Sequence, residues 1–122
     1  MYRLMICGSR NITDTHWVYN MIDSYIRDLG LNKSDLIIVE GCARGVDTIA
    51  QHWAYANKCE VEEHPADWDV YGKAAGFIRN EAMVKCSDYC LILWDGSSKG
   101  TKHDIDLCEK YNLPHKVVIK SK

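Results

Sequence analysis

The 122-residue sequence predicts an α/β protein of the Rossmann-like class, with a doubly wound, mainly parallel five-stranded sheet and helices on both of its faces. Short runs of β-type residues alternate with amphipathic stretches of about ten to fifteen residues, a pattern typical of parallel strands joined by helical crossovers. Two of the runs, Leu36–Val39 and Leu91–Trp94, are continuously apolar, as in strands buried on both faces. No linker or repeat interrupts the alternation, so we expect a single domain over residues 1–122.

The boundaries of the elements follow from local signals. Asp14 is suited to cap the first helix, the apolar residues that follow recur at spacings of three and four, and Gly30 ends the helix. A loop opens at Pro65 and precedes the third helix. The expected strands are Arg3–Cys7, Asp35–Glu40, Cys59–His64, Tyr89–Trp94 and Lys116–Ile119, and the expected helices are Asp14–Gly30, Val46–Asn57, Lys73–Lys85 and Thr101–Tyr111.

Charge and hydrophobicity argue against several kinds of partner. Fifteen Lys and Arg against seventeen Asp and Glu give a net charge of -2, so no overall positive field attracts nucleic acid or an anionic membrane. We therefore expect neither of them as a partner. The apolar runs are much shorter than the roughly 20 residues that cross a bilayer, and the chain starts directly with a strand pattern, so we expect a cytoplasmic protein without a signal peptide.

The six cysteines lie in apolar segments and form no Cys-x-x-Cys pair. Three residues separate Cys86 from Cys90, and His103 and His115 lack the usual spacing of zinc ligands. We therefore expect no metal site, and reduced thiols that pack as small hydrophobic side chains. The cysteines are Cys7, Cys42, Cys59, Cys86, Cys90 and Cys108.

Three loops that contain glycine follow the first, second and fourth expected strands, where a sheet of this kind binds its ligands. Glycine lets backbone amides approach an anion closely, and the helix N-terminus that follows favours negative charge, so the loops are typical of a phosphate site. Tight strand-to-helix turns are the alternative explanation for the glycines. The candidate ligand-binding residues of these loops are Gly8, Ser9, Arg10, Gly41, Ala43, Arg44, Gly45, Asp47, Asp95, Gly96, Ser97, Ser98, Gly100 and Thr101.

The positions of the arginines support a phosphate site, because the planar guanidinium of arginine can donate paired hydrogen bonds to the oxygens of a phosphate or carboxylate. Arg10 and Arg44 fall in the first and second loops, and Arg79 lies in the third helix. We expect Arg10, Arg44 and the loop around Ser98 to share one cationic pocket.

An aromatic segment follows the third expected strand. Trp68 and Tyr71 could stack on a nucleobase or pack in the core. Asp67 could accept a ribose hydroxyl or cap the next helix, and Lys73 is a further candidate ligand-binding residue.

These residues together resemble the SLOG superfamily, and within it the YspA-like group of small stand-alone domains. In the usual pattern the second loop reads Gly-Gly-Ala-Arg-Gly, and Cys42 replaces its second glycine. The resemblance implies a Rossmann-like nucleotide-binding domain that forms oligomers, and it adds Asn80 to the candidate ligand-binding residues. It rests on Gly8-Ser9-Arg10, Gly41–Asp47, Pro65–Trp68, Tyr71–Gly76, Arg79-Asn80, Met83, Trp94–Gly96 and Gly100-Thr101.

One branch of this superfamily, the LOG phosphoribohydrolases, cleaves the N-glycosidic bond of nucleoside monophosphates with an Arg and a Glu. Arg79 matches the Arg, and Asp104 stands at the position of the Glu, so the resemblance makes both candidate catalytic residues. Asp is one methylene shorter than Glu, and a displacement of about 1 Å can cost roughly a hundredfold in rate. Compensation of the helix dipole in the first turn after Thr101 is the alternative role of Asp104.

Three functions follow from this reading. The first is binding of a small-molecule nucleotide, such as ADP-ribose or another NAD-derived signal, by a bacterial sensor or by a phage protein that sequesters it. The second is nucleotide N-glycoside hydrolysis. The third is single-stranded DNA binding, because the resemblance extends to DprA-like proteins. We expect no cofactor, and a homodimer formed through helices.

Overall fold

One sheet of five parallel strands, in the order β3-β2-β1-β4-β5, forms the centre of the computed structural model, which describes residues 1–121. The predicted Rossmann-like, doubly wound fold class is confirmed. The strands are β1 (Tyr2–Gly8), β2 (Leu36–Glu40), β3 (Glu60–Glu63), β4 (Tyr89–Trp94) and β5 (His115–Ile119). The helices are α1 (Thr15–Leu29), α2 (Val46–Ala56), α3 (Trp68–Tyr71), α4 (Ala75–Cys86) and α5 (Lys99–Lys110), with 3-10 turns at Lys33–Asp35 and Gly72–Ala74.

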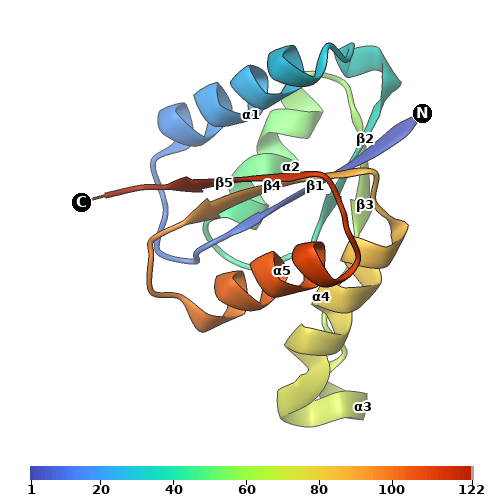
Figure 1. Ribbon diagram of the computed structural model, residues 1–122, viewed down its shortest axis with the longest axis vertical. Coiled ribbons are helices and arrows are strands. Elements are labelled where there is room, and N and C mark those ends of the chain that lie inside the picture. The colour runs from blue at the N-terminus through green and yellow to red at the C-terminus, as the bar shows by residue number, and fades with distance from the viewer. Residues whose placement is uncertain (122) are drawn as a thin grey trace.

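Helices cover both faces of the sheet, α1 and α2 on one side and α4 and α5 on the other (Figure 1). The strand order reverses between β1 and β4, because the chain moves outward from β1 to β3 and then returns to pair β4 with β1. The loops after β1 and β4 therefore lie next to each other at the carboxyl edge of the sheet. Ligands of doubly wound sheets bind at such a reversal.

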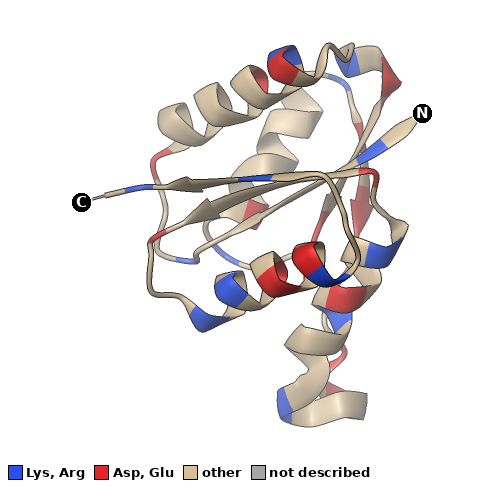
Figure 2. Ribbon diagram, in the orientation of Figure 1, with Lys and Arg blue, Asp and Glu red and all other residues tan. Residues whose placement is uncertain are grey.

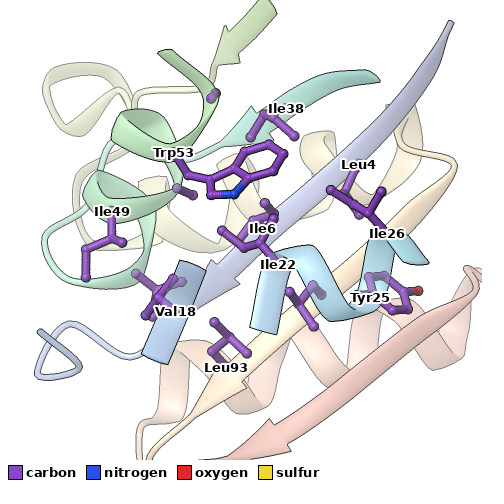
Figure 3. Packing of buried hydrophobic residues seen from close by; sticks show 14 of the residues in the cluster. Leu4, Ile6, Val18, Ile22, Tyr25, Ile26, Ile38, Ile49, Trp53 and Leu93 are labelled. Carbon is purple, nitrogen blue, oxygen red and sulfur yellow. The ribbon is translucent and has the colours of Figure 1, made fainter. Parts of the chain in front are cut away.

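The core beneath α1 and α2 is built around Trp53, which lies between α2 and the sheet near Ile38 (Figure 3). Its indole N–H donates to Asp23 Oδ1 at 3.1 Å, so the one polar atom of this buried side chain is satisfied. From α1, Val18 and Ile22 point to the same core, at the predicted spacing of four residues. This packing holds α1 and α2 on one face of the sheet and leaves the other face to α4 and α5.

Cysteines contribute to the core as expected at Cys7, Cys59, Cys90 and Cys108, which are all buried. The other two depart from the prediction, because Cys42 is exposed and Cys86 is half-buried. All six thiols are free.

The segment before α4 differs most from the sequence prediction. The third helix starts at Ala75 rather than Lys73, and the expected loop contains the short helix α3. Asp67 caps α3, since its Oδ1 accepts a hydrogen bond from the Val70 amide at 3.2 Å. The core-packing alternative for Trp68 is wrong: α3 projects from the body of the protein (Figure 1), and the side chain is 52% exposed.

Gly45 brings the second loop against the first. Its φ of 76° lies in a region that side chains rarely adopt, and a Cβ there would lie 2.6 Å from the carbonyl oxygens of Ser9 and Arg10. Glycine is therefore required for the close approach of the loops after β1 and β2.

We expect Gly45→Ala to destabilise the fold by about 2–6 kcal/mol, because backbone strain and overpacking each cost about 1–3 kcal/mol. Gly30→Ala is the matched control, since Gly30 has a φ of 69° but no atom within 4 Å of the added Cβ. It carries only the left-handed strain of about 1–2 kcal/mol. Urea unfolding of both variants measures the difference, and equal losses would contradict the close approach of the two loops.

Candidate functional site

A cleft of about 480 Å³ opens at the carboxyl ends of β1, β2 and β4, on the side of the sheet covered by α4 and α5. A volume of this size suits a small-molecule ligand. Residues from all three glycine-bearing loops meet here, so segments far apart in the chain contribute to one cavity. The sequence-predicted residues that line it are Gly8, Arg10, Ala43, Asp47, Trp68, Lys73, Arg79, Asn80, Asp95, Ser98, Gly100, Thr101 and Asp104.

Arg44 does not share the cleft with Arg10 and Ser98, contrary to the sequence-based expectation. Its side chain is exposed on the outside of the second loop. The physical reason is the backbone path: the loop turns at Cys42, which has a φ of 62°, and again at Gly45. The predicted residues outside the cleft lining are Ser9, Gly41, Arg44, Gly45, Asp67, Gly96 and Ser97.

Ser9 holds the first and fourth loops together. It is 1% exposed, and its amide donates to the Leu93 carbonyl at 3.0 Å. Its hydroxyl accepts a hydrogen bond from the Asp95 amide at 3.0 Å and lies 3.4 Å from the Thr101 hydroxyl. Ser9 therefore shapes the cleft without lining it.

The N-terminus of α5 presents unused amides to the cleft. The first intrahelical bond runs from the Lys102 amide to the Ser98 carbonyl at 3.1 Å, so the amides of Lys99, Gly100 and Thr101 have no acceptor within the helix. No side chain caps this end, and its first turn contains no acidic residue. Free amides and the positive end of the helix dipole favour an anion at this position.

Asp95 orders the loop before α5. Its Oδ1 accepts hydrogen bonds from the amides of Ser97 at 2.9 Å and Ser98 at 2.8 Å. These bonds lower the pKa of Asp95 to about 2, so the carboxylate is charged at neutral pH. The Asp95 carboxylate thus holds the loop in the geometry that exposes the first-turn amides of α5.

The N-terminus of α2 is occupied differently. Asp47, in its first turn, accepts hydrogen bonds at Oδ2 from the amides of Gly41 at 3.1 Å and Ala43 at 3.3 Å. The Gly41 carbonyl in turn accepts a hydrogen bond from the Arg79 guanidinium. A carboxyl group of the protein therefore uses the amides of the second loop that an external phosphate would require.

Two buried carboxyl groups line the cleft. Asp47 is 4% exposed and Asp104 is 5% exposed, and burial raises the pKa of each to about 7. The nearby Arg79 guanidinium lowers both pKa values, but the effect of burial is larger. Asp104 Oδ1 is buried and makes no hydrogen bond among residues 1–121, while the Cys7 thiol beside the carboxyl group lowers its pKa.

The alternative role of Asp104 as a first-turn charge is wrong. Because α5 begins at Lys99, two residues before the predicted start, Asp104 lies in the second turn of the helix. There it is buried against the cleft rather than set beside free amides.

Cys42 tolerates the position of a usual glycine with the help of Glu40. The amide of Cys42 donates to Glu40 Oε2 at 2.7 Å, and its thiol lies 3.6 Å from Oε1. Although the residue as a whole is exposed, partial desolvation of its thiol and the nearby Glu40 charge raise the pKa of Cys42 to about 12, so the thiol stays protonated. The hydrogen bond from the Cys42 amide to Glu40 helps to hold the turn at a φ of 62° in spite of the side chain.

The lining includes residues that sequence reasoning missed. Gly76 and Met83 lie four residues before and three residues after the predicted Asn80, so one face of α4 borders the cleft. This periodicity was the signal in the sequence that could have identified them. Phe77, which is 51% exposed, carried no such signal. The missed residues are Cys7, Asn11, Gly76, Phe77 and Met83.

Comparison with known families matches residues 2–71 to the YspA, cpYpsA-related SLOG family. The chain belongs to this SLOG family. It is also similar to the Gene 61 protein of Mycobacterium phage D29, with 38% identity over 120 residues that cover 93% of this chain and 94% of the phage protein. The resemblance inferred from the loop motifs is confirmed.

Two solved structures of DNA processing protein A (DprA) are similar to this SLOG domain. The Helicobacter pylori protein has a TM-score of 0.69 at 20% identity, over 98% of this chain and 66% of its own. The Streptococcus pneumoniae protein has a TM-score of 0.75 at 16% identity, over 99% of this chain and 51% of its own. At these identities the likeness concerns the fold, and the chain spans about two thirds and half of the two proteins.

The expectation that nucleic acid is not a partner is contradicted, because the H. pylori structure is described by its single-stranded DNA binding mode. That expectation rested on the net charge, which averages over a surface where Lys and Arg are interspersed with Asp and Glu (Figure 2). A local group of cations, such as Arg10, Lys73 and Arg79 in the cleft, is hidden by such an average.

Two further sequence-based expectations concern a membrane and a second copy of the chain. None of the helices in residues 1–121 combines the length and the apolar character that crossing a membrane requires. The homodimer stays a prediction.

The raised pKa of Asp104 predicts a pH-dependent stability. The folded state retains this proton up to about pH 7, whereas the unfolded chain releases it near pH 4, so the unfolding free energy falls as pH rises between about 4 and 7. Asp104→Asn removes the ionising group, so we expect it to unfold with about 1–4 kcal/mol more free energy than wild type at pH 8 and with little difference at pH 4.5. Urea unfolding at both pH values tests this, and a pH-independent difference would contradict it.

Proposed function

We propose that the cleft binds a phosphate-bearing nucleotide or an NAD- or ADP-ribose-derived ligand, for which the protein acts as a sensor or sequestering module. The observation that carries the proposal is one cleft whose lining combines three chemical kinds of group, which we assign to the three parts of a nucleotide. We call them the phosphate zone (Arg10, Lys73 and the first turn of α5), the ribose zone (Asp47, Asn80 and Asp104) and the base zone (Trp68 and Phe77).

The phosphate zone supports binding of an anion by two independent means. The amides of Gly100 and Thr101 lack helical acceptors, and Arg10 and Lys73 add positive charge to the same lining. Arg10 is exposed and makes no ion pair among residues 1–121, so its guanidinium is available to a phosphate.

The ribose zone suits hydroxyl groups rather than a second phosphate. Burial raises the pKa of Asp47 and Asp104 to about 7, and a ligand hydroxyl can donate to the carboxylate form or accept from the protonated form of each. Asp104 Oδ1 has an unused lone pair, and Asn80, which is buried, adds an amide side chain to the same lining.

The base zone offers flat apolar faces at the rim. Trp68 and Phe77 each expose about half of their surface, so their rings are accessible to a base, and the Phe77 ring also packs against the His103 ring with centroids 4.4 Å apart. Stacking on an aromatic side chain accepts any base and contributes about 1–3 kcal/mol per base.

We expect Arg10→Ala to weaken binding of ADP-ribose and AMP by about 10–100-fold, since a hydrogen bond to a charged group is worth about 1.5–3 kcal/mol. Arg44→Ala is the matched control, because this arginine lies in a neighbouring loop outside the cleft. The affinity of this variant for ADP-ribose and AMP should stay within about twofold of wild type. Isothermal titration calorimetry with ADP-ribose, NAD, AMP and adenosine provides the comparison. The phosphate zone would be wrong if adenosine bound as tightly as AMP, or if Arg44→Ala had the larger effect.

Hydrolysis of the N-glycosidic bond is a second candidate function. It is favoured by the Asp104 carboxyl group, which lies near Arg79, has a pKa of about 7 and leaves Oδ1 without a hydrogen bond among residues 1–121. A carboxyl group in this state can stabilise an oxocarbenium-like sugar and activate water. Incubation of the protein with AMP, NAD and ADP-ribose, followed by heat denaturation and chromatography, separates the two functions. A hydrolase yields free base and sugar phosphate, and Asp104→Asn abolishes this release. Recovery of intact ligand from wild type would exclude hydrolysis and leave binding.

Single-stranded DNA binding is a third candidate, favoured by the fold likeness to the H. pylori protein. A DNA strand presents the same phosphate and base groups that the phosphate and base zones suit. Fluorescence polarisation with a labelled oligothymidylate at several salt concentrations tests it. Binding that ADP-ribose displaces assigns the strand to the cleft, and binding that ADP-ribose leaves unchanged favours a DNA function elsewhere on the surface.

A sensor and a sequestering module both bind their ligand without changing it. A sequestering protein releases its ligand unchanged on denaturation, which the same chromatography detects.

A further inference from the structure

A group of three side chains with metal-ligating atoms lies outside the cleft, where the edge strand β3 meets the C-terminal end of α4. Glu62 belongs to β3, His64 follows that strand directly, and Cys86 is the last residue of α4. One carboxylate oxygen of Glu62, an imidazole nitrogen of His64 and the Cys86 sulfur all lie within 4.8 Å of one another.

We propose that Glu62, His64 and Cys86 form a transition-metal site, with Zn²⁺ as its occupant. Thiolate, imidazole and carboxylate are the ligands that Zn²⁺ prefers, and a water molecule would complete a tetrahedral set. The site is independent of the nucleotide-binding cleft.

The separations of the ligand atoms fit one ion. Glu62 Oε2 lies 2.8 Å from His64 Nε2 and 3.5 Å from Cys86 Sγ, and the sulfur lies 4.0 Å from the imidazole nitrogen. Zn–S and Zn–N bond lengths place ligand atoms about 3.3–3.6 Å apart around a tetrahedral ion. Shifts of about half an ångström therefore convert the hydrogen-bonded triad into a coordination shell.

Neighbouring groups already hold the ligands in position. Arg3 Nε donates to Glu62 Oε1 at 3.1 Å, which leaves Oε2 for the metal. The His64 amide donates to the Glu40 carbonyl at 2.8 Å, so the backbone that carries the imidazole is fixed. Hydrogen bonds of this kind orient metal ligands in proteins and raise their affinity.

Access and charge also suit a divalent cation. The side chains of Glu62 and His64 are 33% and 24% exposed, and Cys86 is half-buried, so an ion can enter from solvent. On binding, the Cys86 thiol releases its proton to solvent, and the resulting thiolate and the Glu62 carboxylate offset the two charges of the ion, while Arg3 leaves one positive charge beside the site.

The site escapes a search for sequence spacing because Cys86 lies 22 residues from His64. Only the packing of α4 beside β3 brings the two together. A bound ion would join the end of α4 to the edge of the sheet, and α4 also carries Arg79 in the cleft.

Zinc and cobalt titrations of the full chain, after treatment with a chelator, test the proposal. We expect one Zn²⁺ per chain, a rise in the thermal midpoint when Zn²⁺ is added, and a thiolate-to-metal charge-transfer band with Co²⁺. Cys86→Ser and His64→Gln should each weaken Zn²⁺ binding more than tenfold, and Cys86→Ser should abolish the cobalt band. Cys42→Ser is the control, since Cys42 is an exposed thiol outside the group, and it should leave affinity and band unchanged.

The proposal is overturned if the wild-type chain binds neither ion, if binding survives both substitutions, or if Cys42→Ser rather than Cys86→Ser removes the cobalt band. Circular dichroism of each metal-free variant separates a lost ligand from a lost fold. If Cys86→Ser does not fold, the affinity of His64→Gln decides.

Discussion

The cleft depends on the buried hydroxyl of Ser9. Strand order alone brings the loops after β1 and β4 to the same edge of the sheet, but it does not fix their separation. Ser9 does so, because its hydroxyl accepts the Asp95 amide and its own amide reaches the β4 carbonyl of Leu93. Its carbonyl also lies so close to Gly45 that the second loop has room only for glycine there. The three loops therefore behave as one unit, and the amides of α5 face a cavity of defined width.

The same architecture places an energetic cost at the cleft. Asp47 and Asp104 are buried where the neutral form of each carboxyl group is favoured, and Asp104 Oδ1 has no partner within the described chain. A fold selected for stability alone would place apolar or fully hydrogen-bonded groups at these positions. Their presence beside a helix N-terminus that no side chain caps suits a ligand with both hydroxyl groups and negative charge.

Local signals made most of the fold predictable. Asp14 and Gly30 mark the ends of α1 as expected, and the apolar run at Leu91 corresponds to a strand buried at the centre of the sheet. Side-chain direction was not predictable, because it depends on φ values that the sequence does not reveal. Cys42, in a left-handed conformation, turns the second loop so that Arg44 faces solvent while Arg10 reaches the cleft.

Contacts between segments far apart in the chain could not be predicted from the sequence either. Lys73 and Arg79 join Arg10 in the cleft in place of the expected Arg44, and the metal-ligating triad forms only where the end of α4 meets β3. Burial of Asp104 required knowledge of where α5 begins, and a shift of two residues moved it from the first turn to the second. Motif residues were thus predictable as a set, whereas the division between those that line the cleft and those that support it came from the three-dimensional structure.

The central claim is that the phosphate of a nucleotide binds at the N-terminus of α5. An NMR titration of ¹⁵N-labelled protein with ADP-ribose tests it most directly, because the amide of each loop residue reports separately. We expect saturable shifts that are largest at the amides of Arg10, Gly100 and Thr101. Saturable shifts confined to residues away from the cleft, or no saturable shift with ADP-ribose, NAD or AMP, would contradict the account.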